Sequence, residues 1–196
     1  APGYIEAIKT IKAVIVGEKN DSITPGLVKS IPYASSTLQI GKGAPGLIIL
    51  ESISGNEETW VSSDGIYLVF KEGRIIQTKG FYNNLVSLKS QETNSKKLVD
   101  SGRSETFFYY YSYDEPKLIN MKVNVERRFI RKESVQLLGH EKQLNLIEER
   151  IENDYIGWRA TNKFWVDDEM FIWKSHQSIS PKLPKFYIEV TKKPAE

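Results

Sequence analysis

Three adjacent carboxylates are the densest group of potentially reactive side chains in this sequence. Asp167, Asp168 and Glu169 lie in a predicted turn between two aromatic-rich strands. Glycoside hydrolases use two carboxyl groups, one as an acid and one as a base or nucleophile, at a separation of roughly 5 to 9.5 Å. The sequence does not fix that separation, and the pattern favours a solvated acidic turn over a catalytic pair.

The other patterns that commonly carry chemistry are incomplete. Residues 41–46 are glycine-rich and contain Lys42, but they lack the Gly-Lys-Ser/Thr that opens a helix in phosphate-binding loops, so a hairpin loop is predicted. His140 and His176 are the only histidines, and neither belongs to a known metal-ligand pattern. The chain has no cysteine and no Gly-x-Ser-x-Gly. We therefore expect no catalytic residue, no metal and no cofactor.

Aromatic side chains are the stronger indication of a binding function. All four tryptophans lie in predicted strands, and tyrosines crowd residues 109–113. Successive side chains of a strand face opposite sides, so part of each aromatic run must point outward or into a cavity. Exposed rings suit the C–H faces of sugars or a protein partner, whereas core packing is the alternative that we favour for most of them. The aromatic candidates for a binding surface are Trp158, Trp165, Trp173, Tyr109 and Tyr111.

Arg74 is the charged residue of interest in the predicted hairpin of residues 59–85. It directly follows the predicted turn at Gly73. A guanidinium can hold a carboxylate through two parallel hydrogen bonds, or it can donate to a backbone carbonyl. We therefore predict that Arg74 is a structural clamp. Gly65, Gly73 and Gly80 are predicted to serve the backbone geometry of the turns.

Length and charge limit the class of protein. A chain of 196 residues fits one domain, with or without a small appendage. Lys and Arg number 27 against 25 Asp and Glu, a net charge of +2 that is too balanced to indicate nucleic-acid binding. No segment approaches the roughly 20 apolar residues that a transmembrane helix needs.

The first part of the chain is predicted to be helical. Apolar residues recur at spacings of three and four over about residues 4–16, which predicts one amphipathic helix packed on the domain or, as the alternative, bound to a membrane surface or a partner. Residues 1–22 are therefore assigned to an N-terminal helix or tether, and residues 23–196 to the main domain. A short helix is predicted over residues 25–31, ended by Pro32.

From Tyr33 onward the pattern changes to short strands with turn signals between them. The polar residues 83–103 are predicted to be a loop with a short helix near 85–88. Many short strands with almost no helix between them predict a mainly β, antiparallel barrel-like or sandwich domain. The predicted strands cover residues 36–40, 47–50, 59–62, 66–71, 74–78, 106–113, 118–131, 134–138, 144–151, 157–160, 163–167, 171–175 and 185–191.

An ordered set of motifs resembles one known family. The motifs are Ile31-Pro32-Tyr33-Ala34-Ser35, Trp60-x-Ser-x-Asp-Gly, Gly73-Arg74-Ile75-Ile76-x-Thr78-x-Gly80-Phe81, Asn162-x-Phe164-Trp165-Val166-Asp167 and Ile172-Trp173-Lys174-Ser175-x-Gln177-x-Ile179-x-Pro181. In this order they resemble the YjbF/GfcB family of group 4 capsule and exopolysaccharide lipoproteins, over about residues 23–194. No single motif is specific, but the ordered set is.

The resemblance implies a cellular location and a protein partner. It implies a β-barrel-like lipoprotein on the periplasmic side of the outer membrane of a Gram-negative bacterium, with an outer-membrane β-barrel protein of the polysaccharide secretion system as partner. It implies no enzyme activity and no catalytic residue. The lipidated cysteine of the family is absent from this sequence. A chain that continues after that cysteine would explain the difference, and a homologue without an anchor is the alternative.

Three functions stay open on these grounds. The leading one is a non-enzymatic accessory factor in capsule or exopolysaccharide assembly or export that binds a protein partner. The second is a glycan-binding module that contacts the polysaccharide through the Trp158–Trp173 region. The third is a polysaccharide-modifying enzyme that uses the carboxylates of residues 167–169.

Overall fold

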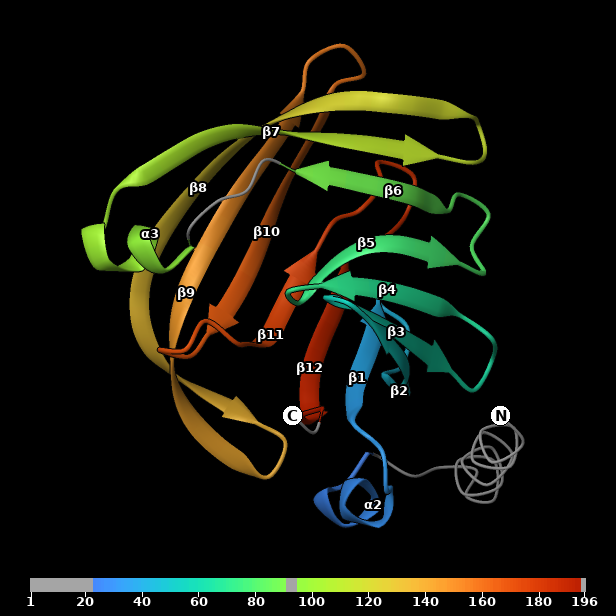
Figure 1. Cartoon of the computed structure of the whole chain (residues 1–196), viewed down its shortest axis with the longest axis vertical. Helices are drawn as coiled ribbons and strands as arrows, with labels where there is room; N and C mark the ends of the chain where they lie inside the picture. Colours follow the sequence, from blue (N-terminus) through green and yellow to red (C-terminus); the bar gives the residue numbers. More distant parts are fainter. Residues whose placement is uncertain (1–22, 91–94, 195–196) are drawn as a thin grey trace.

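A single antiparallel sheet forms the body of the protein (Figure 1). The computed structural model describes residues 23–90 and 95–194, and the helix predicted over residues 4–16 lies outside them. Within the described residues, twelve strands lie side by side in the order β5-β4-β3-β2-β1-β12-β11-β10-β9-β8-β7-β6, and the neighbouring strands pair antiparallel. The prediction of a mainly β, antiparallel barrel-like domain is confirmed.

Two short helices accompany the strands in the part of the chain that the structure describes. The elements are α2 (Pro25–Ser30), β1 (Ser35–Ile40), β2 (Gly46–Ser54), β3 (Glu57–Ser62), β4 (Tyr67–Lys71), β5 (Arg74–Lys79), β6 (Leu85–Ser90), α3 (Ser95–Ser101), β7 (Ser104–Tyr113), β8 (Leu118–Leu137), β9 (His140–Asn153), β10 (Trp158–Val166), β11 (Ile172–Gln177) and β12 (Phe186–Lys192).

The sheet curls until its two edge strands meet. β5 and β6 are the two ends of the sheet order, yet they are consecutive in the chain and lie against each other. The backbone N–H of Leu85 donates to Oγ1 of Thr78 over 2.9 Å where the chain passes from one to the other. Because the twist between neighbouring strands accumulates across a large sheet, such a sheet curls, and here the result is a nearly closed barrel.

Antiparallel connections divide the loops between the two ends of the barrel. One end, called here the α2 end, carries α2, the β4–β5 turn, α3, the β8–β9 turn and the β10–β11 loop. The opposite end carries the β5–β6, β7–β8, β9–β10 and β11–β12 connections. In Figure 1 the β8–β9 hairpin and α2 lie at the bottom and the β9–β10 turn lies at the top.

The structure corrects several predicted boundaries. The predicted helix near residues 85–88 is wrong, because this segment is strand β6 and pairs with β7 from Leu85↔Tyr113 to Ser90↔Tyr109. Residues 118–131 and 134–138 join into the single long strand β8, and residues 157–160 and 163–167 join into β10. Pairing with neighbouring strands overrides local polar interruptions, which is the usual limit of propensity arguments in sheets.

The predicted short helix before the barrel is confirmed as α2. The Thr24 hydroxyl caps it by accepting from the Leu27 N–H at 3.2 Å, and Pro25 occupies the start, where its missing N–H costs nothing. The helix ends before Ile31, which is extended because Pro32 follows it. Pro25 also lies against the β8–β9 turn, since a Cβ added to Gly139 would come within 3.2 Å of it.

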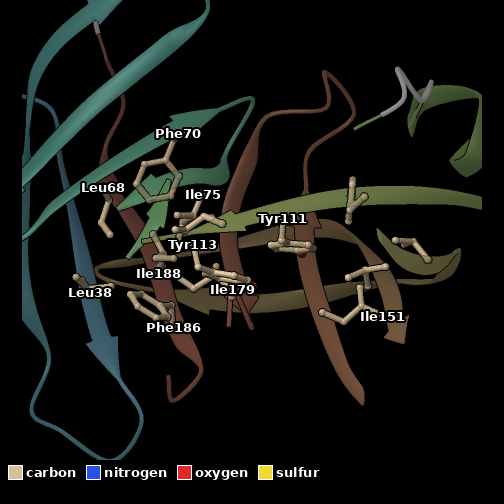
Figure 2. Packing of buried hydrophobic residues seen from close by; sticks show 14 of the residues in the cluster. Leu38, Leu68, Phe70, Ile75, Tyr111, Tyr113, Ile151, Ile179, Phe186 and Ile188 are labelled. Carbon is tan, nitrogen blue, oxygen red and sulfur yellow. The ribbon is translucent and has the colours of Figure 1, made fainter. Parts of the chain in front are cut away.

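The barrel interior is filled by apolar side chains from nearly every strand. Figure 2 shows Leu38, Leu68, Phe70, Ile75, Tyr111, Tyr113, Ile151, Ile179, Phe186 and Ile188 converging there. Tyr109, Tyr111 and Tyr113 all point inward because they are two residues apart on one strand, and they form a continuous row of ring contacts. The interior is therefore a packed core over most of its length.

Candidate functional site

Four of the five aromatic candidates do not lie at the surface. Tyr109, Tyr111, Trp158 and Trp165 are at most 8% exposed, so the prediction that they present a binding surface is wrong. Tyr111 packs edge-on against Trp158 at 5.4 Å between ring centroids, inside the barrel. For Tyr109, Tyr111 and Trp158 the physical reason is that the inward face of a twelve-stranded sheet needs large side chains to fill it.

Trp165 is buried on a different surface. It packs in a separate cluster with Leu144, Leu146 and the end of the β8–β9 hairpin, and its Nε1–H donates to Oε1 of Glu133 at 2.7 Å. Trp173 is the one candidate that stays half-exposed. A binding role for Trp173 therefore stays a prediction.

Arg74 holds a carboxylate from across the barrel. Its Nη1 and Nη2 donate to Oε2 and Oε1 of Glu149 at 2.9 and 2.6 Å, a two-bond fork between β5 and β9. Arg127 Nε donates to the same Oε1 at 2.7 Å, and the Tyr109 hydroxyl donates to it at 3.1 Å. These four residues, called here the buried ion cluster, have the geometry of the predicted clamp. The clamp role in stability stays a prediction.

Burial and charge oppose each other in this cluster. Burial alone would raise the pKa of Glu149, but the charges and hydrogen bonds of Arg74 and Arg127 outweigh it and hold that pKa below its usual value. Burial lowers and the Glu149 carboxylate raises the pKa of Arg74, with a net rise. Burial raises the pKa of Tyr109 well above its usual value, so this hydroxyl stays protonated as a donor. Glu149, Arg74 and Tyr109 each keep the protonation state that satisfies their neighbours.

Gln177 forms hydrogen bonds across the barrel, a role that was not predicted from the sequence. Its Oε1 accepts from the Ile75 N–H at 3.0 Å, and its Nε2 donates to the Gly73 carbonyl at 2.9 Å. A glutamine at a buried, alternate position of a strand was the available signal, because a buried amide needs several partners. Together with Arg74 it fixes the β4–β5 turn against β9 and β11.

The acidic turn between β10 and β11 is occupied by structural contacts. Oδ1 of Asp167 accepts from the backbone N–H groups of Glu169 and Phe171 at 3.1 and 2.9 Å, and Oδ2 accepts from Trp173 Nε1 at 2.8 Å. Asp168 accepts from Lys132 Nζ at 2.9 Å and from the Asn145 amide at 3.1 Å. Among these carboxylates only that of Glu169 has no hydrogen-bond or ion-pair partner among the described residues. This geometry caps a turn and offers no acid–base pair.

The two histidines, His140 and His176, have different surroundings. Nδ1 of His140 lies 3.1 Å from the Leu138 carbonyl in the β8–β9 turn. His176 lies between the rings of Trp165 and Tyr187, and burial, followed by the charges of Lys174, Lys185 and Lys163, lowers its pKa to about 4. Within residues 23–90 and 95–194 no group of three or more His, Asp or Glu side chains is arranged to hold a metal ion.

A pocket opens at the α2 end of the barrel. It has a volume of about 340 Å³ and lies where the β4–β5 turn, the β10–β11 loop and the last residues of β12 meet. Trp60, Phe70 and Ile188 form its apolar floor, and Phe171 and Trp173 form one wall. We call it the end pocket; it is where the structure places Trp173.

The charged side chains that line the end pocket differ in whether they have partners. Two lysines line it and both are paired: Lys174 Nζ lies 3.6 Å from Oε2 of Glu189, and Lys193 Nζ lies 3.7 Å from Oδ2 of Asp167. Three carboxylates line it, and one of them, Glu58, accepts from Trp60 Nε1 at 3.0 Å. The side chains of Glu72 and Glu169 are exposed and have no partner among the described residues.

Fold and site together define a class of protein. It is a β-barrel-like domain with a packed interior, a hydrogen-bonded buried ion cluster and a small aromatic pocket at its α2 end. In the part of the chain that the structure describes, no helix is both long and apolar enough to cross a membrane.

Comparison with known protein families identifies the family to which the chain belongs. The sequence profile described as "Group 4 capsule polysaccharide lipoprotein gfcB, YjbF" matches residues 8–191. The chain belongs to this family of capsule polysaccharide lipoproteins. The resemblance inferred from the ordered motifs is confirmed.

Relatives in Escherichia coli (strain K12) are distant but span most of the chain. "Uncharacterized lipoprotein YjbF" is 20% identical over 167 residues, which is 83% of this chain and 77% of the relative. "Uncharacterized lipoprotein GfcB" is 20% identical over 163 residues, which is 82% of this chain and 76% of the relative. The crystal structure of the hypothetical lipoprotein YmcC from the same organism superposes with a TM-score of 0.76 at 20% identity and covers 96% of both chains. At that identity the structure bears on the fold alone.

Proposed function

We propose that this protein is a non-enzymatic accessory factor in the assembly or export of a capsule or exopolysaccharide, that it is held on the periplasmic side of the outer membrane by a lipid anchor, and that it binds an outer-membrane β-barrel protein of the same secretion system. The observation that carries the non-enzymatic part is the use of the charged groups. Glu149, Asp167 and Asp168 all bind structural partners within the protein. Neither Asp167 nor Asp168, the carboxylates of the predicted acidic turn, is therefore free to act as the acid or base of glycosidase chemistry.

An exposed apolar surface at the end opposite α2 supports the proposal of a protein partner. Among the described residues, five large hydrophobic side chains are exposed there, and we call them the apolar rim: Tyr82, Leu118, Ile119, Tyr155 and Ile156. Hydrogen bonds connect the loops that carry them, since the Asn84 amide donates to Asp114 at 2.7 Å and the Asn153 amide donates to the Lys122 carbonyl at 2.8 Å. Exposed Tyr, Leu and Ile side chains gathered at one end are typical of a protein interface.

The test starts from a strain that lacks the protein. Polymer is measured separately in the medium and in the periplasm. Polymer trapped in the periplasm is expected, because an export factor acts after synthesis. Normal export with chemically altered polymer would overturn the proposal in favour of a modifying enzyme, and normal export of normal polymer would overturn it outright.

Rim variants then test the partner surface. Ile119→Lys together with Tyr155→Lys is expected to abolish co-purification of the outer-membrane partner and to trap polymer in the periplasm. Ile53→Lys is the matched control, because Ile53 is 53% exposed but lies in the β2–β3 hairpin at the α2 end. Equal losses from the control would show that the effect is not specific to the rim.

A further inference from the structure

We propose that the end pocket binds one or two sugar residues of the polysaccharide, and that it prefers neutral or amino-bearing sugars to uronic acids. The inference rests on the proposed function, since it names the ligand class for a protein of polysaccharide export. It concerns a different end of the barrel from the partner surface. The two can therefore fail separately.

The size and opening of the pocket fit a short stretch of a polymer. A volume of about 340 Å³ is at the lower end of the roughly 300 to 1,000 Å³ of small-molecule sites. The floor is closed by Trp60 and Phe70, both at most 5% exposed. The exposed side chains of Glu72 and Glu169 stand at the border, so the pocket communicates with solvent along one side. A polysaccharide that runs along this open side can place one sugar ring in the pocket without having its end there.

The wall of the pocket offers flat apolar faces. The rings of Phe171 and Trp173 meet edge-to-face at 5.2 Å, and Nζ of Lys193 lies 4.0 and 4.9 Å from their centroids. The Lys193 side chain is 38% exposed and long enough to swing into solvent. The C–H face of a sugar can then replace the ammonium over the same rings, which is the usual way aromatic side chains hold sugars.

The charges of the pocket select the kind of sugar. Both lysines are already paired with carboxylates, whereas Glu72 and Glu169 have spare acceptor oxygens. Ionised carboxylates only accept hydrogen bonds, so the matching ligand must donate them through hydroxyl or ammonium groups. A uronate would place like charge beside these two carboxylates and would be disfavoured.

The experiment uses the purified full chain and fragments of the polysaccharide made by the organism that produces this protein. A partial hydrolysate is separated by ion exchange into a neutral and cationic pool and an anionic pool. Each pool is titrated by calorimetry and by tryptophan fluorescence, since Trp60 and Trp173 both line the pocket. Palmitate is titrated in parallel as a probe for an acyl chain in the same apolar space.

Three substitutions connect binding to the pocket. Glu72→Gln and Glu169→Gln are each expected to raise Kd about tenfold, the usual effect of losing one charge-assisted hydrogen bond. Glu57→Gln is the matched control, because Glu57 precedes the pocket residue Glu58 on β3 and its side chain faces the other way. Val190→Trp, which fills the pocket, is expected to abolish binding, and if it fails to fold the two glutamine variants still decide the question.

The outcomes separate the inference from the proposed function. Binding of the neutral and cationic pool that Glu72→Gln and Glu169→Gln weaken and Glu57→Gln leaves unchanged is the expected result. Binding of neither pool, preference for the anionic pool, or binding of palmitate alone would overturn the inference. If pocket variants lose sugar binding in vitro while the deletion strain exports normally, the proposed function fails and the sugar site stands. If no sugar binds while rim variants still trap polymer, the sugar site fails and the proposed function stands.

Discussion

The buried ion cluster and the end pocket are built from the same kinds of side chain but in opposite conditions. Both combine carboxylates, cationic groups and aromatic rings within one barrel. In the cluster, one oxygen of Glu149 accepts from Arg74, Arg127 and Tyr109 together. In the pocket, Glu72 and Glu169 stand at the edge of solvent with no partner among the described residues. The difference teaches that charge density alone does not mark a binding site.

The state of hydrogen bonding distinguishes the two regions. A buried ion must be saturated by the protein itself, because leaving it unpaired costs several kcal/mol. Such a group has nothing left to offer a ligand. A polar group without a partner can persist only where water reaches it, and there a ligand can replace the water. We therefore assign stability to the cluster and recognition to the pocket.

The largest expected effect tests the cluster directly. Glu149→Gln removes the negative charge that two guanidinium groups share, so it should lower the free energy of unfolding by about 3 to 5 kcal/mol. Urea unfolding followed by tryptophan fluorescence measures it. The matched control is Glu72→Gln in the pocket, which should change stability by less than about 0.5 kcal/mol. Equal losses of unfolding free energy from the two substitutions would show that the ion cluster stabilises the fold no more than the pocket does.

The next effect concerns the turn that joins the two regions. Gly73 has φ of 70°, and a Cβ there would lie 2.8 Å from Ile172, so Gly73→Ala should cost about 2 to 4 kcal/mol from backbone strain and overpacking together. Gly55→Ala separates the two causes, because Gly55 has φ of 61° with nothing within 4 Å of the added atom. Thermal unfolding of both variants should show the larger loss at Gly73. The reverse order would mean that the turn is not pressed against β11.

A smaller effect tests whether the fork of Arg74 matters beyond its charge. Arg74→Lys keeps the charge but cannot donate two parallel bonds to Glu149, so a loss of about 2 kcal/mol is expected. Arg159→Lys serves as the control, since Arg159 is 74% exposed and its ion pairs with Glu152 and Asp154 should contribute little. If Arg74→Lys leaves both the urea midpoint and polymer export intact, the clamp interpretation is wrong.

The smallest effect is a pH dependence that lies outside both regions. The pKa of His176 falls from about 6.5 in the unfolded chain to about 4 in the fold. The neutral form is therefore favoured by folding, and stability should be complete above pH 6.5 and decline as the pH falls from 6.5 toward 4. Because His176 is only half-buried, solvent screening should limit the loss to about 1 kcal/mol.

Unfolding experiments at several pH values check this prediction. His176→Gln should flatten the stability profile between about pH 5 and 6.5. The ion cluster should not contribute between about pH 5 and 6.5, but below about pH 5 it adds its own loss, because the pKa of Glu149 in the fold lies below its usual value and the unfolded chain takes up that proton first. A slope that survives in His176→Gln would assign the effect to another group.

Local pattern predicted much of the fold. Alternating apolar residues placed the strands, and the glycines at 65, 73 and 80 placed turns, all with positive φ in the structure. Segment 85–88 was the local error, because its partner strand β7 lies some twenty residues further on and pairing decided its conformation. The prediction failed where a contact distant in sequence overrode local propensity.

The sequence by itself determined the strand content, the turns, the family and the residue types that a clamp and a binding wall require. Only the tertiary structure decided which side each aromatic ring faces, because curling into a barrel turns one face of the sheet into a core. It also decided that Arg74 meets Glu149, 75 positions away, and that the exposed Glu72 and Glu169 border one pocket. Periodicity is a local property of the chain, whereas the partner of a charge depends on how the whole sheet closes.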